Sequence, residues 1–455
     1  MKILIFIEHD VMIRHFIDSQ SFNSLINEHQ VVFIFPEKGH KRVTRKIDNR
    51  LLNAPYLHLT INQKRQKIWK RLFQVNLLRW KKGQQHKALR IFHREMIGWK
   101  AALHYSLLAL PGLYYLFRYY SFFQIKNETN IDLQNLIYEE KPDLIIHPSV
   151  LEGVFINDLV DVSQNSSIPL VVIMNSWDNP STKRAMIGTP DWLLVWGEQT
   201  KKHAIKYVEM EAQKVFSFGA AQFEVYKKPP RINRDRFCKI HNIDPKMIIL
   251  LYAGSSKNTD EYTHLLLIDD AIEQGSFGDM KVVYRPHPWG GGGKGGERII
   301  EHKWKNICIE SSMKNYLMNL NGGHGRMSFP DYYDTHDVLS SVDIIISPLS
   351  TILLEGAIHG KPVLCFLPKE EKHARHFQLD SSLIHFQDMF NMSEFLIAEG
   401  HSELIPMIEV LVNKSKDSEF KDNLNKVCNY FVQSFEKSYD KRLLDFCENI
   451  AIKSC

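Results

Sequence analysis

Short apolar runs alternate with longer, helix-like stretches along most of the chain. In its first half these runs predict six strands: Ile3–Ile7, Gln30–Phe35, Asp143–Ile146, Pro169–Met174, Trp192–Trp196 and Val215–Phe218. The runs are apolar throughout, so we expect both faces of their sheet to be covered, as in a parallel sheet. Strands separated by helical stretches are typical of βαβ units in a doubly wound sheet.

A second alternation of the same kind begins after a polar, basic stretch that contains Pro229-Pro230. It predicts five more strands: Met247–Tyr252, Lys281–Tyr284, Asn306–Ile309, Val342–Ile346 and Pro362–Phe366. The proline pair and the polar composition indicate a linker. The sequence therefore predicts an α/β protein with two Rossmann-like doubly wound domains, 1–228 and 246–400, joined by a linker at 229–245. A helical tail follows over 401–455, with a return to the N-terminal domain as one option.

Composition agrees with this architecture and excludes several classes. A length of 455 residues suits two or three domains, and 44% apolar with 24% charged residues is typical of a globular chain, not a disordered or fibrous one. The six cysteines are scattered without a C-x-x-C pair, so neither a zinc site nor a disulfide framework is predicted. The first apolar run is shorter than a secretory signal needs. We expect a cytoplasmic protein.

Charge singles out one segment of the first half. Residues 61–100 hold twelve Lys/Arg and one acid, a local charge of 12 − 1 = +11, while the whole chain carries +5. The aromatic stretch Ala101–Phe123 comes next and is long enough to cross a bilayer, which takes about 20 residues. Arg118 and a central Pro111-Gly112 disfavour a crossing. We therefore expect a helical insert over 61–125, which either binds an anionic membrane surface through 61–123 or packs on its own domain.

The most specific chemical signal is the segment Ser341–Phe366, SVDIIISPLSTILLEGAIHGKPVLCF. A buried strand ends at Ser347, and Ser350 and Thr351 open a helix that carries Glu355 one turn later. Hydroxyls and free amides at a helix N-terminus bind phosphate, and a carboxylate one turn on can accept hydrogen bonds from a ribose. The alternative is that Ser350 is only an N-cap and Glu355 a solvated helix residue.

Two further strand ends in the second half could bind the same ligand. In Arg285-Pro286-His287-Pro288 the prolines hold His287 in an extended path, from which it can donate to phosphate or stabilise a leaving nucleotide, and Arg285 can bind phosphate in a bidentate manner. Gly254 and Ser255 can offer backbone amides. The glycine-rich stretch Trp289–Gly296 lacks the Ser or Thr that a P-loop places after its lysine, so we interpret it as a flexible loop.

In the first half, acidic residues follow two apolar strands. Asp178 ends one strand and Glu8 another, so either could be the general base or nucleophile of the reaction. His9, Asp10 and His147 also lie at strand ends. The alternative for Asp178 is that it caps a turn before Pro180.

Together, these segments resemble the GT-B glycosyltransferase superfamily, in particular a bacterial surface-polysaccharide branch. That branch includes CDP-glycerol glycerophosphotransferases, Kdo transferases and sialyltransferases, and its fold is related to that of UDP-N-acetylglucosamine 2-epimerases. The resemblance rests on His287-Pro288, on SPLSTILLEGAIHGKP at 347–362, and on SWDNPSTK, DWLLVWGEQTKKHA and FGAAQFEVY at 176–183, 191–204 and 218–226. It covers roughly 143–226 and 247–366, and the basic insert lies outside it.

The resemblance implies a metal-independent GT-B glycosyltransferase without a cofactor, whose nucleotide-sugar donor lies between two domains that face a cleft. His287 with Ser347, Ser350 and Thr351 would hold phosphate and Glu355 the ribose. The acceptor would be a surface-polysaccharide or lipid-linked saccharide at the inner membrane, as in capsule or lipopolysaccharide biosynthesis. Alternatives are a glycerol-phosphate-type transferase, a nucleotide-sugar epimerase, and a nucleic-acid-binding protein that uses the basic segment. No nucleic-acid module accompanies that segment, so we expect no nucleic-acid partner.

Overall fold

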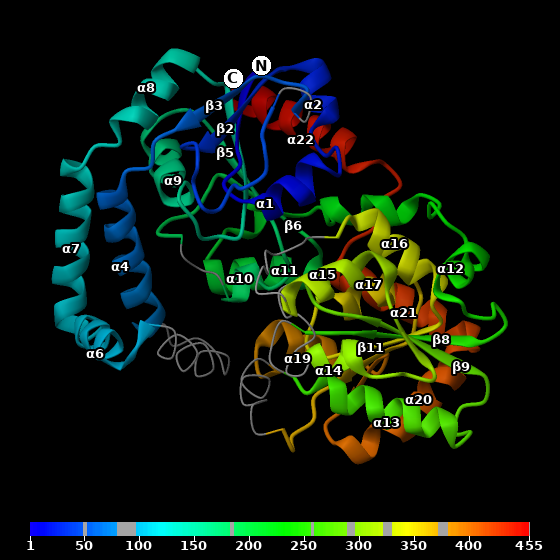
Figure 1. Ribbon diagram of the computed structural model, residues 1–455. Helices are drawn as coiled ribbons and strands as arrows, with labels where there is room; N and C mark the ends of the chain where they lie inside the picture. Colours follow the sequence, from blue (N-terminus) through cyan, green and yellow to red (C-terminus); the bar gives the residue numbers. More distant parts are fainter. Residues whose placement is uncertain are drawn as a thin grey trace. The chain divides into compact units, whose positions relative to one another are not determined.

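The computed structural model describes residues 1–48, 52–79, 97–182, 186–255, 259–288, 296–321, 330–371 and 381–454 (Figure 1). The chain forms two compact units. One comprises Met1–Glu224 and Tyr430–Cys455, and the other Val225–Asn429. Each unit is built around its own parallel sheet.

The N-terminal unit holds a seven-stranded sheet in the order β3-β2-β1-β4-β5-β6-β7, and every pair is parallel. Its strands are β1 (Lys2–Phe6), β2 (Gln30–Pro36), β3 (Tyr56–Leu59), β4 (Leu144–Ser149), β5 (Leu170–Met174), β6 (Trp192–Val195) and β7 (Val215–Ser217). The six predicted strands are confirmed. The sequence did not reveal β3, because this edge strand exposes Leu57 and His58 and so lacks an apolar run.

Helices cover both faces of this sheet, as a parallel sheet requires. The helices of this unit, including those of the insert, are α1 (Asp10–Met12), the π-helix η1 (Ile13–Ile17), α2 (Asn23–Glu28), α4 (Gln63–Arg79), α6 (Trp99–Leu108), α7 (Pro111–Asn127), α8 (Ile131–Glu140), α9 (Ile156–Asn165), α10 (Asn179–Thr182), α11 (Glu198–His203), η2 (Ala204–Val208), η3 (Ala212–Lys214), η4 (Ala221–Lys227) and α22 (Tyr439–Ser454).

The C-terminal helix α22 completes the core of the N-terminal unit. Its Tyr439, Leu443, Cys447 and Ile450 are buried in one cluster with the side chains that β1, β2, β4 and β5 present to the same face. Arg442 of α22 donates to the carbonyl oxygen of Phe218, 3.0 Å away, just beyond β7. The last helix of the chain is thus part of the unit that contains its first strand.

The described part of the predicted insert is mostly helical, with a turn at 109–110. Helices α4 and α7 lie side by side, and α6 contacts both of them (Figure 1). Pro111 begins α7, which explains why the aromatic stretch breaks into two helices there. Among the described residues, no helix is both long and apolar enough to cross a membrane.

The C-terminal unit holds a six-stranded parallel sheet in the order β10-β9-β8-β11-β12-β13. Its strands are β8 (Ile248–Ala253), β9 (Met280–Arg285), β10 (Ile307–Ile309), β11 (Ile344–Ser347), β12 (Val363–Phe366) and β13 (Phe395–Ala398). All five predicted strands are confirmed, and β13 is an additional edge strand. Its helices are α12 (Arg234–His241), α13 (Glu261–Glu273), α14 (Gly296–Glu301), α15 (Ser311–Asn321), α16 (Tyr332–Ser341), α17 (Ile352–Ile358), α19 (Ile384–Phe390), α20 (His401–Ser415) and α21 (Ser418–Phe431).

In both sheets the first strand lies in the middle, and the chain continues outward from it first on one side and then on the other. Right-handed crossovers therefore place the connecting helices on opposite faces, and the order reverses between β1 and β4 and between β8 and β11. Such a reversal leaves the carboxyl ends of the two strands open to a ligand. The two doubly wound sheets confirm the predicted fold class.

Replacing one buried side chain at the centre of α22 tests whether this helix is part of the core of the N-terminal unit. Leu443 is fully buried, so Leu443→Ala should lower the stability of this unit by about 2–5 kcal/mol through lost burial and a residual cavity. Lys441→Ala, on the exposed side of the same helix, should change it little. Thermal unfolding by circular dichroism measures both, and equal midpoints for the two variants would contradict the packing described here.

Candidate functional site

Three polar segments meet the carboxyl edge of the C-terminal sheet at neighbouring strands. Gly254 and Ser255 follow β8, Arg285 ends β9 and is followed by His287, and Ser347 ends β11. Because β9, β8 and β11 are adjacent and parallel, these ends lie at one edge, and the order reverses within this group. The sequence-predicted donor residues of this unit are thus brought together by the sheet itself.

The turn after β8 is held by a buried carboxylate. Glu261, the first residue of α13, accepts hydrogen bonds from the amide of Ser255 (2.8 Å), the hydroxyl of Thr259 (3.2 Å) and the hydroxyl of Tyr284 (2.6 Å). Burial raises its pKa to about 7. Glycine at 254 leaves room for this carboxylate, since a Cβ there would lie 2.6 Å from one Glu261 oxygen and would force it to shift. Because the Ser255 amide donates to Glu261, it is not available to a phosphate. The turn after β8 therefore offers fewer backbone amides to a ligand than the sequence predicted.

His287 is half-buried beyond β9, and burial, followed by the charge of Arg285, lowers its pKa to about 4. The imidazole is therefore neutral at pH 7, the form that can donate one hydrogen bond to a phosphate oxygen. Arg285 is itself buried, donates to the Thr335 hydroxyl at 3.0 Å and faces Glu310 at 3.8 Å. Some of the hydrogen-bond donors of its guanidinium are therefore already paired within the unit. Bidentate phosphate binding by Arg285 stays a prediction.

The turn between β11 and α17 presents three hydroxyls. Ser347 is fully buried, and its Oγ has no hydrogen-bond partner among the described residues. Ser350 accepts from the amide of Ile352 at 3.4 Å, as an N-cap would, while the half-buried Thr351 makes no capping bond with its side chain. The N-cap alternative thus accounts for Ser350 and leaves the half-buried Thr351 for a ligand, whereas the fully buried Ser347 would contact one only if its surroundings opened.

Glu355 lies one turn into α17 and is part of an aromatic cluster that the sequence did not reveal. The Tyr226 hydroxyl donates to its carboxylate, and the Tyr226 ring lies 4.5 Å from that of His359. His359 contacts the Glu355 carbonyl through Nδ1 and His336 through Nε2, at 2.7 and 2.9 Å. Burial lowers the pKa of His359 to about 4. Glu355 is thus half-buried and held in place by Tyr226, and its role at a ribose stays a prediction.

A second group of side chains at this edge could hold a metal ion. One ligand atom each from His264, Glu371 and His401 lies within 4.8 Å of the others, and these residues come from α13, from the stretch after β12 and from the start of α20. In the structure they contact one another: His264 bonds Glu371 through Nε2, and its Nδ1 lies 2.6 Å from the Tyr252 hydroxyl. Two histidines and a carboxylate form a ligand set that suits zinc or iron.

In the N-terminal unit, Glu8 is enclosed. It is fully buried and accepts from the amides of Val154 and Phe155 at 2.7 and 3.1 Å and from Arg42 at 3.3 Å. Gly153, at a φ of 149°, allows this contact, since a Cβ there would overlap the carboxylate. Glu8 therefore ties β1 to the turn after β4, and a role as general base would require this network to open.

Two other strand-end residues of this unit differ in accessibility. His147 was predicted to follow its strand but lies within β4, which continues to Ser149; it is buried, with Nδ1 2.9 Å from the Phe6 carbonyl and Nε2 without a partner among the described residues. Asp178, after β5, is half-buried and accepts from Thr182 Oγ1 at 2.9 Å and from Asn179 at 3.2 Å. These are the contacts expected if Asp178 caps the turn before Pro180. Its side chain is nevertheless more accessible than that of Glu8. A catalytic role for either acid stays a prediction.

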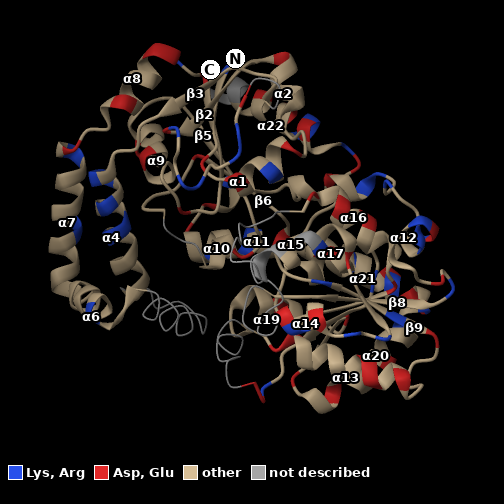
Figure 2. Cartoon of the chain, in the orientation of Figure 1, with Lys and Arg blue, Asp and Glu red and all other residues tan. Residues whose placement is uncertain are grey.

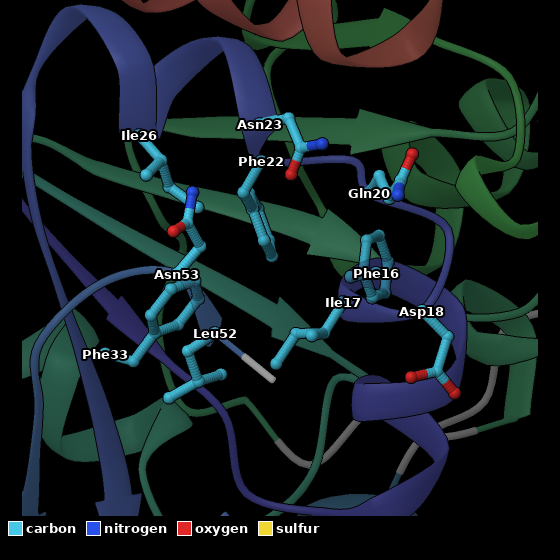
Figure 3. Close-up of a pocket in the computed structure, with 10 residues that line it drawn as sticks. All are labelled: Phe16, Ile17, Asp18, Gln20, Phe22, Asn23, Ile26, Phe33, Leu52 and Asn53. Carbon is cyan, nitrogen blue, oxygen red and sulfur yellow. The ribbon is translucent and has the colours of Figure 1, made fainter. Parts of the chain in front are cut away.

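The N-terminal unit also contains a pocket of about 360 Å³ (Figure 3). Apolar side chains from η1, α2 and β2 line it together with Leu52, and Asp18, Gln20, Asn23 and Asn53 add polar groups. None of the sequence-predicted site residues lines it. We therefore do not assign it to the reaction.

Some functional residues could not be found from the sequence. Glu261 and His264 are three residues apart after a Gly-Ser turn, which is a local signal that could have been followed. The remaining residues, Tyr226, Glu371 and His401, come from segments that are far apart in the sequence. Nothing in the sequence next to each of them predicts that they lie at this edge. The glycine-rich residues 289–295 lie outside the described part of the chain.

The fold is that of known GT-B proteins. A UDP-N-acetylglucosamine 2-epimerase from Neisseria meningitidis, solved with UDP-GlcNAc, superimposes with a TM-score of 0.56 at 12% identity and covers 99% of this chain and 100% of its own. The enzyme of that name from Methanocaldococcus jannaschii gives 0.52 at 13% identity, over 98% and 100%. A variant of the wall teichoic acid polymerase TagF gives 0.50 at 10%, over 99% and 89%. No family model and no curated protein matches the sequence.

Acid should destabilise the protein partly through His287. Its pKa is lowered in the folded state, so between pH 6.5 and about 4 the unfolded chain binds more protons and stability falls as the pH drops. In His287→Asn, the decrease in the free energy of unfolding on acidification should be smaller by up to about 3 kcal/mol. Urea unfolding at pH 7 and pH 4.5 measures the difference, with the exposed His104→Asn as control. An unchanged pH dependence in His287→Asn would contradict a buried, neutral imidazole.

Gly254→Ala tests the support of the turn after β8. The added methyl must push the Glu261 carboxylate away, which weakens its bond to the Ser255 amide, and we expect a loss of about 1–3 kcal/mol. Gly112→Ala is the matched control, since a Cβ there meets nothing within 4 Å. Chemical denaturation measures both, and a Gly254→Ala variant as stable as the control would argue against the tight contact.

Proposed function

We propose that this protein is a glycosyltransferase of the GT-B type that moves a sugar from a nucleotide-activated donor to a surface-polysaccharide or lipid-linked acceptor. The observation that carries the proposal is the carboxyl edge of the C-terminal sheet. There, Gly254, His287 and the Ser347–Glu355 segment follow adjacent strands where the order reverses. Doubly wound sheets bind nucleotides at such points.

Each group at this edge has a role in the proposed reaction. The neutral His287 and the hydroxyls of Ser347 and Thr351 would donate to the diphosphate, and negative charge that develops on the leaving nucleotide would raise the pKa of His287 towards protonation. Glu355, oriented by Tyr226, would accept hydrogen bonds from the ribose. In the N-terminal unit, Asp178 is the more accessible candidate for the base that activates the acceptor.

A nucleotide-sugar epimerase is the second candidate. The epimerase from Neisseria meningitidis, solved with UDP-GlcNAc, shares the fold over nearly the whole chain. This likeness supports a UDP-sugar as the ligand of this protein, whether it acts as a transferase or as an epimerase. An epimerase exchanges a sugar proton with solvent, whereas a transferase does not need to. Incorporation of deuterium from heavy water into unreacted UDP-GlcNAc would therefore favour the epimerase. A glycerol-phosphate-type transferase differs from both in its donor and is distinguished by turnover of CDP-glycerol.

Nucleotide binding is the first property to measure. A ligand that binds only the folded state raises the unfolding midpoint, so a screen of CMP, CDP, UDP and GDP should identify the base. For that nucleotide, Glu355→Gln should weaken binding about tenfold, the equivalent of about 1.4 kcal/mol for an impaired ribose contact. Titration calorimetry measures the dissociation constant.

The control is Glu419→Gln on the exposed surface of α21, which should bind like the parent protein. His287→Ala and Glu355→Ala should both lose transfer from the matching nucleotide-sugar. The proposal fails if both variants retain full transfer.

A further inference from the structure

The insert exposes an unusual amount of apolar surface. Ten large side chains of α6 and α7 and the turn between them are 47–74% exposed: Trp99, Leu103, Leu107, Leu110, Leu113, Tyr115, Leu116, Tyr119, Tyr120 and Phe123. We call them the hairpin face. Their spacing of three and four residues places them in stripes along the two helices. Among the described residues, more than half of the exposed large hydrophobic side chains belong to this face.

The hairpin face is not needed to pack the insert. The opposite side of α7 already has a core, in which Ile125 lies with Trp69 and Leu72 of α4. The Tyr114 hydroxyl donates to Asn76 of α4 at 2.8 Å, and the buried Arg65 joins the base of α4 to Asp158 of α9 at 2.9 Å and to the Ile125 carbonyl at 2.7 Å. The insert is therefore anchored on one side and apolar on the other.

The three helices of the insert carry charge of one sign. Helices α4, α6 and α7 contain nine Lys/Arg residues and no Asp or Glu. Among the described side chains, Arg65 pairs with Asp158 and Lys64 with Glu128. Others, including Lys67, Lys70, Arg71, Lys100 and Lys126, are exposed. Figure 2 shows α4 with several blue segments and α7 almost entirely tan.

From this combination we infer that the hairpin face inserts into the interface of an anionic lipid bilayer, and that the exposed cations of α4, α6 and α7 are attracted by the lipid phosphates. Tyrosine and tryptophan are the side chains that lie best at a membrane interface, because they combine an apolar ring with a polar group. An apolar helix face accompanied by cations binds anionic lipid through burial and electrostatic attraction together. The inference concerns the N-terminal unit alone and does not depend on the proposed glycosyl transfer.

Vesicle binding tests the inference. The full chain should co-sediment with vesicles of phosphatidylcholine and phosphatidylglycerol and bind pure phosphatidylcholine much more weakly, with affinity that falls as salt rises. Leu116→Ser together with Tyr119→Ser should weaken binding at least tenfold. Lys67→Glu together with Lys70→Glu should weaken it at least about 25-fold on anionic vesicles, from about fivefold per lost cation.

Controls of the same chemistry come from the C-terminal unit. Ile240→Ser removes a side chain that is 49% exposed, and Lys239→Glu reverses an exposed charge, so both variants should bind vesicles like the parent. The replaced hairpin residues are exposed, so these variants should keep their unfolding midpoints and their nucleotide affinity. A failure of vesicle binding is thereby distinguished from a failure of the proposed function.

Two results would overturn the inference. One is equal binding of the hairpin variants and the C-terminal controls to anionic vesicles. The other is a stable dimer in light scattering that Leu116→Ser with Tyr119→Ser dissociates, in a protein that does not bind vesicles. In that case a second copy of the chain covers the hairpin face.

Discussion

The need to cover both faces of two parallel sheets determines most of this molecule. A parallel strand buries side chains on both sides, so its sequence is a continuous apolar run and its connection must be a helix that crosses a face. In the N-terminal unit the requirement extends to the end of the chain, because α22 supplies the side chains that close one face. The same requirement removes polar groups from the strands and concentrates them where the strands end.

This constraint explains how much of the fold could be predicted. Most of the eleven predicted strands were found because they are buried on both faces, whereas β3 was missed because two of its four side chains are exposed and His58 interrupts its apolar residues. The edge strand β13 was missed although Phe395–Ala398 is apolar throughout. The candidate site followed from the same logic, since polar residues after buried strands must share an edge. Partners from elsewhere, such as Tyr226 on Glu355 or His401 near Glu371, could not be predicted, because tertiary packing alone brings them there.

The structure also separates residues that the sequence treats alike. Glu8 and Asp178 both follow apolar strands, yet Glu8 is enclosed by two backbone amides and Arg42, while Asp178 remains half-buried beside a short helix. The difference arises from neighbours distant in sequence: the turn at Gly153, which approaches Glu8 closely because it lacks a side chain, has no counterpart at Asp178. Two carboxylates in the same type of position therefore have different access to a reacting group.

The insert differs from the two sheets in that it leaves apolar side chains exposed. In the two sheets, helices cover the apolar faces of the strands, and the buried charged residues Glu8, Arg285 and Glu261 lie near the strand ends. In α6 and α7 the side that packs on α4 is apolar and the opposite side is apolar as well, so a fully aqueous setting would leave a large uncompensated surface. A sequence alone could assign the basic charge of 61–100 equally to a solvated hairpin or to a membrane surface, and this exposure is the observation on which the proposed membrane binding rests. A solvated hairpin would need only one apolar side, and this one has two.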